Sequence, residues 1–173
     1  MIKIKDYVKG FTLIELLIVI ALLGALAVGL LAAVDPFEQL KKGKDTSMRN
    51  TAAEFFNSQI RYYAAKGQFA WVTAGPVGFA TGESRDLGAL SSAITETASA
   101  GELKAGFYEL GGGSSNLNKI NVNWLASDQM IVCFQPQSKS FRIDTNTKYD
   151  SSGGISPNCP SSATATDCFI CFQ

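Results

Sequence analysis

The cysteines are the residues best suited to redox, metal-binding or cross-linking chemistry, and all four lie in the C-terminal part of the sequence. Cys168 and Cys171 form a C-x-x-C pair in the sequence CFIC. Such pairs carry out thiol–disulfide exchange in a thioredoxin-like βαβ setting, which the sequence around CFIC does not suggest. A four-cysteine zinc site needs two such knuckles, and only one is present. Outside the cytoplasm, an even number of cysteines would instead favour two disulfides.

The pairing of these cysteines is open, because four cysteines permit three connectivities. Cys133 falls in the strand-like sequence QMIVCFQ, and Cys159, Cys168 and Cys171 fall in a tail rich in Ser, Gly and Thr. A bond from Cys133 to the tail would tie the tail to a sheet and contribute about 2–4 kcal/mol of stability. The sequence does not choose between the three, and we favour Cys133 with Cys171 and Cys159 with Cys168.

The other residues of the sequence give little support for catalysis or ligand binding. The sequence contains no histidine, which excludes Ser-His-Asp and Cys-His mechanisms and histidine-ligated metal. Asp144, Asn146 and Asp150 have partly calcium-loop-like spacing in DTNTKYDSSG, but Lys148 occupies a ligand position and no Glu follows at the twelfth. A solvated turn is therefore preferred over a calcium site. We expect no enzyme activity, no cofactor and no metal.

The charge of the chain bears on its partners. Lys and Arg number 15 and Asp and Glu number 15, so the formal net charge is zero. Nucleic-acid binding depends on a high density of Lys and Arg, so no nucleic-acid partner is expected.

Glu15 is a carboxylate inside an otherwise apolar run. Between residues 11 and 34 the only residues that are not apolar are Thr12, Glu15, Gly24 and Gly29. As a helix this stretch would be roughly 36 Å long, enough to cross a hydrocarbon core of about 30 Å. The sequence therefore predicts one membrane-spanning helix followed by a soluble domain. Lys3, Lys5 and Lys9 precede the run, and this short basic leader favours an N-terminus in the cytoplasm with the domain exported.

The stretch KGFTLIELLIVIALLGALAVGLLAAVDP resembles the class III leader and N-terminal helix of type IV pilins and type II secretion pseudopilins. The matching residues are Gly10, Phe11, the sequence Thr12-Leu13-Ile14-Glu15, and a long apolar helix that contains Gly24. The resemblance implies that a prepilin peptidase cuts between Gly10 and Phe11 and that the new Phe11 amine is N-methylated. It also implies that Glu15 meets the positive amine of a neighbouring subunit in a filament core. Gly24, Gly29 and Pro36 are candidate positions for a break in this helix.

The partners and location follow from the same resemblance. It implies copies of the chain in a helical homopolymer, the prepilin peptidase and N-methyltransferase, an assembly platform in the inner membrane, and the membrane itself before assembly. The chain would be a single-pass cytoplasmic-membrane protein that later becomes part of an extracellular filament at the cell surface.

We expect four segments: a leader (1–10), a transmembrane and filament-core helix (11–35), an amphipathic half of the same helix (36–67) and a globular head (68–173). In the amphipathic half, a semi-apolar stripe recurs at spacings of three and four after a wide first gap, and it consists of Leu40, Met48, Ala52, Phe55, Gln59, Tyr62 and Tyr63. The opposite face consists of Lys41, Asp45, Arg49, Glu54 and Arg61. Gly67 is expected to end the helix.

The head is expected to be a small antiparallel sheet packed on this helix, which gives an α+β, type IV pilin-like fold. Residues 68–84 read as a loop, and the following sequence SRDLGALSSAITETASAGEL reads as a short helix that ends at Gly101. Alternating apolar and polar residues predict strands at 106–110, 119–124, 129–135 and 139–144. The sequence PQS (136–138) reads as a hairpin turn. Trp71 and Trp124 are expected in the core.

The preferred function is a pilin subunit that polymerises into a type IV pilus-like filament. A pseudopilin of a type II secretion system, or a minor pilin, is the alternative within the same family. An alternative of another class is a membrane-anchored binding domain that does not polymerise.

Overall fold

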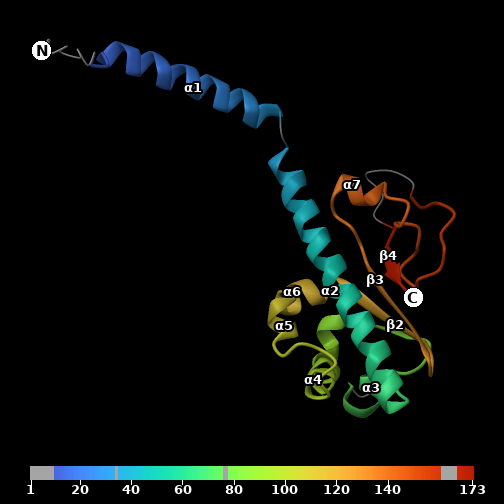
Figure 1. Cartoon of the computed structure of the whole chain (residues 1–173). Coiled ribbons are helices and arrows are strands. Elements are labelled where there is room, and N and C mark those ends of the chain that lie inside the picture. Colours follow the sequence, from blue (N-terminus) through green and yellow to red (C-terminus); the bar gives the residue numbers. More distant parts are fainter. Residues whose placement is uncertain (1–9, 34, 76–77, 161–166) are drawn as a thin grey trace, which may run out of the picture. The chain divides into compact units, whose positions relative to one another are not determined.

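The computed structural model describes residues 10–33, 35–75, 78–160 and 167–173 (Figure 1). The chain divides into two compact units, Met1–Phe37 and Glu38–Gln173. Most of the predicted leader, residues 1–9, lies outside the described residues. The fold is α+β as predicted: a long apolar N-terminal helix is followed by helices, a small antiparallel sheet and two disulfides.

The N-terminal unit contains α1, Leu13–Ala33, which is long and apolar enough to cross a membrane. Its mean hydropathy over the most apolar window is 2.9, and none of its residues is buried within the chain. The helix is continuous through Gly24 and Gly29. The idea that these glycines mark a place where the helix melts concerns the assembled filament and stays a prediction.

The chain leaves the helical conformation just before Pro36. Helix α1 ends at Ala33, and α2, Pro36–Lys66, begins at Pro36 itself. Proline lacks a backbone donor and is favoured at the first position of a helix, where that donor would have no partner. The Asp35 carboxylate accepts the Phe37 N–H at 3.1 Å, so Asp35 caps the start of α2.

Helix α2 supplies one side of the core of the head. The predicted stripe is buried at Met48, Ala52, Phe55, Gln59 and Tyr62, which recur at spacings of three and four. The helix ends where predicted, because Gly67 has a φ of +73° and donates its N–H to Tyr63 O at 2.7 Å.

The burial of two residues of α2 differs from the prediction. Leu40 was assigned to the stripe but is 65% exposed. Asp45 was assigned to the solvated face but is fully buried. Asp45 lies three residues before Met48 and therefore continues the buried stripe by one step, so helical spacing favoured burial and only its charge argued against it.

A four-stranded antiparallel sheet completes the head, in the order β1-β2-β3-β4. The central strands β2, Ile120–Ala126, and β3, Gln129–Phe134, agree with the predicted strands. The edge strands β1, Glu83–Asp86, and β4, Ile170–Phe172, were not predicted. Both are short, so neither shows enough alternation to be recognised from its own residues.

Two predicted strands are wrong. Residues 106–110 contain the helix α5, Phe107–Leu110, which begins after Gly106 turns the chain with a φ of +79°. Residues 139–144 contain the helix α7, Lys139–Arg142, so the preceding PQS is not a hairpin turn. Phe107 of α5 is buried, and Phe141 of α7 packs against the core while partly exposed. A run of five or six residues does not distinguish one such helical turn from the alternation of a strand.

The remaining helices lie around α2 and the sheet (Figure 1). The predicted short helix is present as η1, Leu87–Leu90, and α4, Ser91–Ser99, with Gly101 in the left-handed conformation after it. Its first predicted residues, 84–86, lie in β1 instead, so the predicted start is wrong. Helix α3, Ala70–Ala74, interrupts the segment that was predicted to be a loop. Helix α6, Gly113–Leu117, precedes β2. Trp71 is buried and Trp124 packs on the same core, as expected.

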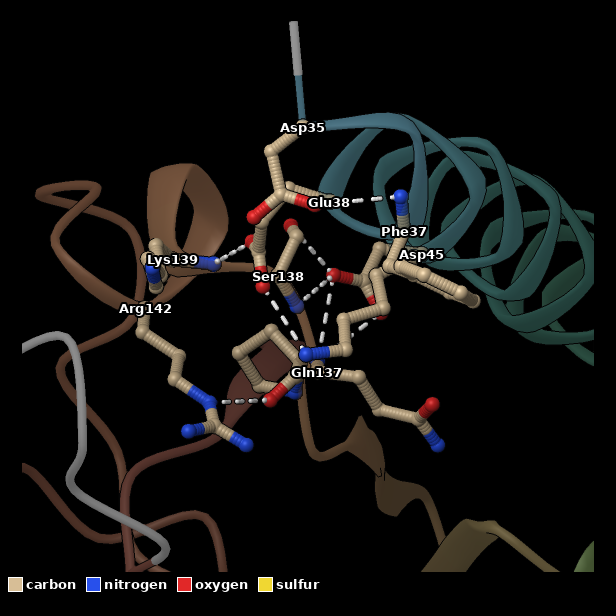
Figure 2. Close-up of polar contacts among 10 residues, drawn as sticks. Asp35, Phe37, Glu38, Asp45, Gln137, Ser138, Lys139 and Arg142 are labelled. Atoms are coloured by element: carbon tan, nitrogen blue, oxygen red, sulfur yellow. Dashed lines mark hydrogen bonds and ion pairs between the residues drawn. The ribbon is translucent and has the colours of Figure 1, made fainter. Parts of the chain in front are cut away.

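The buried carboxylate of Asp45 joins α2 to the segment that follows β3 (Figure 2). It accepts hydrogen bonds from Gln137 N–H at 2.9 Å, Ser138 N–H at 2.7 Å and the Ser138 hydroxyl at 2.6 Å. Glu38, two helical turns earlier, accepts the Lys139 N–H at 2.9 Å. These two acids hold the start of α7 against the first turns of α2.

Removing the Asp45 carboxylate should destabilise the head strongly. Asp45→Ala would leave the buried N–H and hydroxyl of Ser138 and the half-buried N–H of Gln137 without their acceptor. We expect a loss of about 3 kcal/mol in the free energy of unfolding. Asp45→Asn keeps one acceptor oxygen and should lose less. Urea unfolding of the full chain in detergent micelles, followed by circular dichroism, measures both losses.

The matched control is Asp86→Ala, because Asp86 is an exposed acid whose side chain makes no capping hydrogen bond. Its stability should change by less than about 0.5 kcal/mol. Equal stabilities for the Asp45 and Asp86 variants would contradict the assigned role of Asp45.

Candidate processing and assembly site

The first turn of α1 brings Thr12 and Glu15 together. The Thr12 N–H and the Thr12 hydroxyl both donate to Glu15 Oε2, at 2.8 and 2.7 Å. The Glu15 N–H donates back to Thr12 Oγ1 at 3.3 Å. This reciprocal pattern is a capping box, in which a Thr at the N-cap and a Glu three residues later satisfy each other's backbone donors.

The capping box gives Glu15 a role within the single chain that sequence reasoning missed. The signal was present, since T-x-x-E before an apolar run is the typical sequence of a capping box. The box holds the carboxylate at the helix start, where the helix dipole also favours an acid. Within the described residues all hydrogen bonds to this carboxylate go to Oε2, so Oε1 is available to a donor from another molecule.

Gly10 and Phe11, the residues on either side of the expected cleavage, lie directly before this box. Both are exposed, and the Phe11 side chain is 80% exposed. A new amine formed at Phe11 would therefore lie next to Thr12, at the same end of the helix as Glu15. Gly24, Gly29 and Pro36 lie farther along the chain and are not part of this arrangement.

The surface of α1 is apolar all round. Its Leu, Ile and Val side chains are between 45 and 81% exposed. An apolar surface of this extent requires cover from lipid or from other helices.

The structure contains the disulfides Cys133–Cys171 and Cys159–Cys168, which is the pairing that the sequence analysis favoured. Cys133 and Cys171 are directly opposed on β3 and β4, so the first bond holds an edge strand to the centre of the sheet. The second closes a loop with a sequence separation of 9. Cys168 and Cys171 bond to different partners, so CFIC is not a redox pair in this structure.

The residues considered for calcium form two local turns. Asp144 accepts hydrogen bonds from the backbone and side-chain amides of Asn146, both at 2.8 Å. Asp150 accepts from the Ser152 hydroxyl and from the backbone N–H groups of Ser152 and Gly154, and the Ser152 hydroxyl contributes most to holding the pKa of Asp150 below its usual value. Among the described residues, no three His, Cys, Asp or Glu side chains are grouped to hold a metal.

The comparison with protein families decides what the N-terminal arrangement is. Residues 5–31 match the family described as the prokaryotic N-terminal methylation motif. The chain carries a class III prepilin leader. This leader is the one found in type IV pilins and pseudopilins, so the resemblance inferred from KGFTLIELL is confirmed. The prepilin leader and most of α1 make up the matched region, and the head lies outside it.

The head has no counterpart in the other comparisons. No curated protein and no solved structure gives a significant match to the chain. The prepilin leader therefore supports a pilin-like or pseudopilin protein, of a kind that is generally not enzymatic, and the role of the head rests on its own structure.

The capping box can be tested in the single chain. Thr12→Ala removes the side-chain acceptor and donor of the box and should destabilise the first turn of α1 by about 1 kcal/mol. This corresponds to roughly fivefold faster amide exchange in that turn. Exchange measured by NMR in detergent micelles should show the change at Glu15 and Leu16, whose N–H groups donate to Thr12 Oγ1 and Thr12 O, and little change beyond the first turns.

Thr12→Ser is the matched control, because serine keeps the hydroxyl and should keep the slow exchange. Equal exchange rates in the Thr12→Ala and Thr12→Ser chains would show that the box does not stabilise the helix.

Proposed function

We propose that the chain is a structural subunit that polymerises through α1 into a type IV pilus-like filament, with the heads on the outside. The observation that carries the proposal is the prepilin leader directly before a helix whose apolar surface is entirely exposed in the single chain. A bilayer can cover that surface before assembly, and copies of α1 can cover it in a filament.

The proposed processing creates the polar partner of Glu15. The prepilin peptidase would cut between Gly10 and Phe11, remove the basic leader and leave a positive amine on Phe11, which is then methylated. In an apolar bundle a carboxylate and an ammonium group attract strongly, and each alone is costly. The free Oε1 of Glu15 would accept the Phe11 amine of a neighbouring subunit and so set the register between copies of α1.

The proposed route starts in the cytoplasmic membrane. The leader would lie in the cytoplasm and the head outside, where the two disulfides can form. An assembly platform in the inner membrane would then transfer subunits from the bilayer into the filament at the cell surface.

Processing predicts a defined N-terminus. Mass spectrometry of the protein from assembled filaments should find chains that begin with N-methylated Phe11 and lack residues 1–10. Filaments built from chains that retain the leader would overturn this step.

Glu15→Ala should leave membrane anchoring intact and impair filament assembly. A charge near the interface costs little, so membrane insertion should be unchanged or slightly improved. Filament number, counted by electron microscopy, should fall at least tenfold because the amine of each incoming subunit loses its partner. Glu15→Gln should be similarly defective, since a neutral amide does not balance the amine.

The matched control is Glu54→Ala, which removes an exposed acid of α2 that pairs with Arg61 at 3.4 Å. This variant should assemble normally. Normal filaments from Glu15→Ala would contradict the role proposed for Glu15, while the prepilin leader and the membrane anchor would still stand.

The second candidate is a pseudopilin of a type II secretion system or a minor pilin, and the same leader favours it equally. Purified surface filaments distinguish the two: a major pilin should be the dominant protein in long filaments. A pseudopilin or minor pilin should be a trace component, or its loss should stop secretion. A non-polymerising membrane-anchored binding domain would give no filaments at all.

A further inference from the structure

One edge of the head combines positive charge with an exposed apolar side chain. It consists of Lys41 and Lys42 in the second turn of α2, Lys139 at the start of α7 and Ile143 directly after α7. We call these four residues the α2/α7 edge. All four are exposed, and Ile143 is 60% exposed. Lys139 and Ile143 are four residues apart in a helical turn, so they share one side of α7.

The two acids of α2 hold this edge close to the point where the chain leaves α1. Glu38 accepts the Lys139 N–H, and Asp45 holds Gln137 and Ser138 (Figure 2). Glu38 comes five residues after Ala33, the last residue of α1. Five residues span at most roughly 18 Å when fully extended, so the covalent connection limits how far Glu38 can be from the last residue of α1.

The acids near this edge are already engaged. Glu38 forms an ion pair with Lys41 at 2.8 Å, and this hydrogen bond, together with the one from the Lys139 N–H, holds the pKa of Glu38 below its usual value. Asp45 is buried, and Asp144 accepts hydrogen bonds from Asn146. Lys42 and Lys139 line a shallow cleft of about 230 Å³ together with Glu38, Gln39 and Ser140.

We propose that the α2/α7 edge is the surface by which the head binds the headgroups of an anionic phospholipid bilayer. Lys42 and Lys139 would contact lipid phosphates, and Ile143 would enter the interface between headgroups and acyl chains. A basic side chain near an anionic bilayer surface strengthens binding roughly fivefold. The proposal rests on the membrane-anchored stage of the proposed function and gives the head a defined position there.

A bilayer fits this edge better than a second copy of the chain does. The short covalent connection to α1 keeps the edge tethered to the bilayer in every inserted molecule, without a second subunit. This connection is equally short whichever side of the membrane the head occupies.

Hydrogen exchange on the full chain tests the proposal. The chain is inserted, one copy per disc, into lipid nanodiscs of phosphatidylcholine alone or of an equal mixture of phosphatidylcholine and phosphatidylglycerol. Mass spectrometry should find the peptide that contains α7 and Ile143 exchanging several-fold more slowly in the phosphatidylglycerol discs. The peptide that contains Ile155 should exchange equally in both.

The variants identify the side chains responsible. Lys42→Gln combined with Lys139→Gln should abolish the difference between the two lipids, and it leaves the Lys139 backbone hydrogen bond in place. Ile143→Ser should reduce the protection. The matched controls are Lys66→Gln, at the opposite end of α2, and Ile155→Ser, where the side chain is 72% exposed, and both should behave like the unchanged chain.

Three results would overturn the proposal: equal exchange in the two lipids, protection that survives the double lysine change, or protection that appears only with two copies in a disc. The last would identify a second copy as the partner. A chain that fails to insert into discs would overturn the membrane-anchored stage of the proposed function as well. Insertion without protection of α7 would overturn the present proposal alone.

Discussion

No described residue of the chain covers the apolar surface of α1, and the proposed passage of the protein from membrane to filament follows from this constraint. Lipid tails and a bundle of identical helices are equally apolar, so little hydrophobic energy is gained when α1 moves from one to the other. Polar groups must then determine the axial position of the helix and the neighbouring helix with which it packs. The described part of α1 has them at its start, where Thr12 and Glu15 form the capping box.

The capping box also gives the Glu15 carboxylate hydrogen-bond donors before any assembly. Glu15 is not an isolated charge in an apolar helix, because it already accepts two hydrogen bonds in the single chain. A preoriented carboxylate loses less conformational entropy when it binds a second partner. A single residue can therefore stabilise the helix before assembly and serve as an acceptor during it.

The head depends on polar side chains of α2, the second long helix. Besides its apolar stripe, α2 contributes buried polar side chains that connect distant segments. Gln59 bonds to Thr97 of α4 at 2.7 Å and accepts the Ala70 N–H at 3.2 Å, while Asp45 holds the segment before α7. Because buried polar groups are costly when unpaired, these contacts favour one arrangement of the surrounding loops over others. They also couple the position of α7 to the first turns of α2, close to the membrane span.

Several parts of the structure could be predicted from the residues within a single segment. These parts are the apolar helix, the stripe of α2, its end at Gly67, the short helix before Gly101 and the two central strands. Periodicity is a local property, so a long segment shows it without knowledge of its partners. The prepilin leader is local in the same sense, since it is read from consecutive residues.

Features that need a partner from elsewhere in the chain could not be predicted in this way and are visible in the folded structure. The edge strands β1 and β4 are too short to be recognised and exist because β2 and β3 offer them hydrogen bonds. Residues 106–110 and 139–144 alternate like strands, yet local turns and the Asp45 carboxylate place them in helices. Asp45 itself looks like a surface acid, and its burial is tolerated only because Gln137 and Ser138, more than 90 positions away, bring the donors that satisfy it.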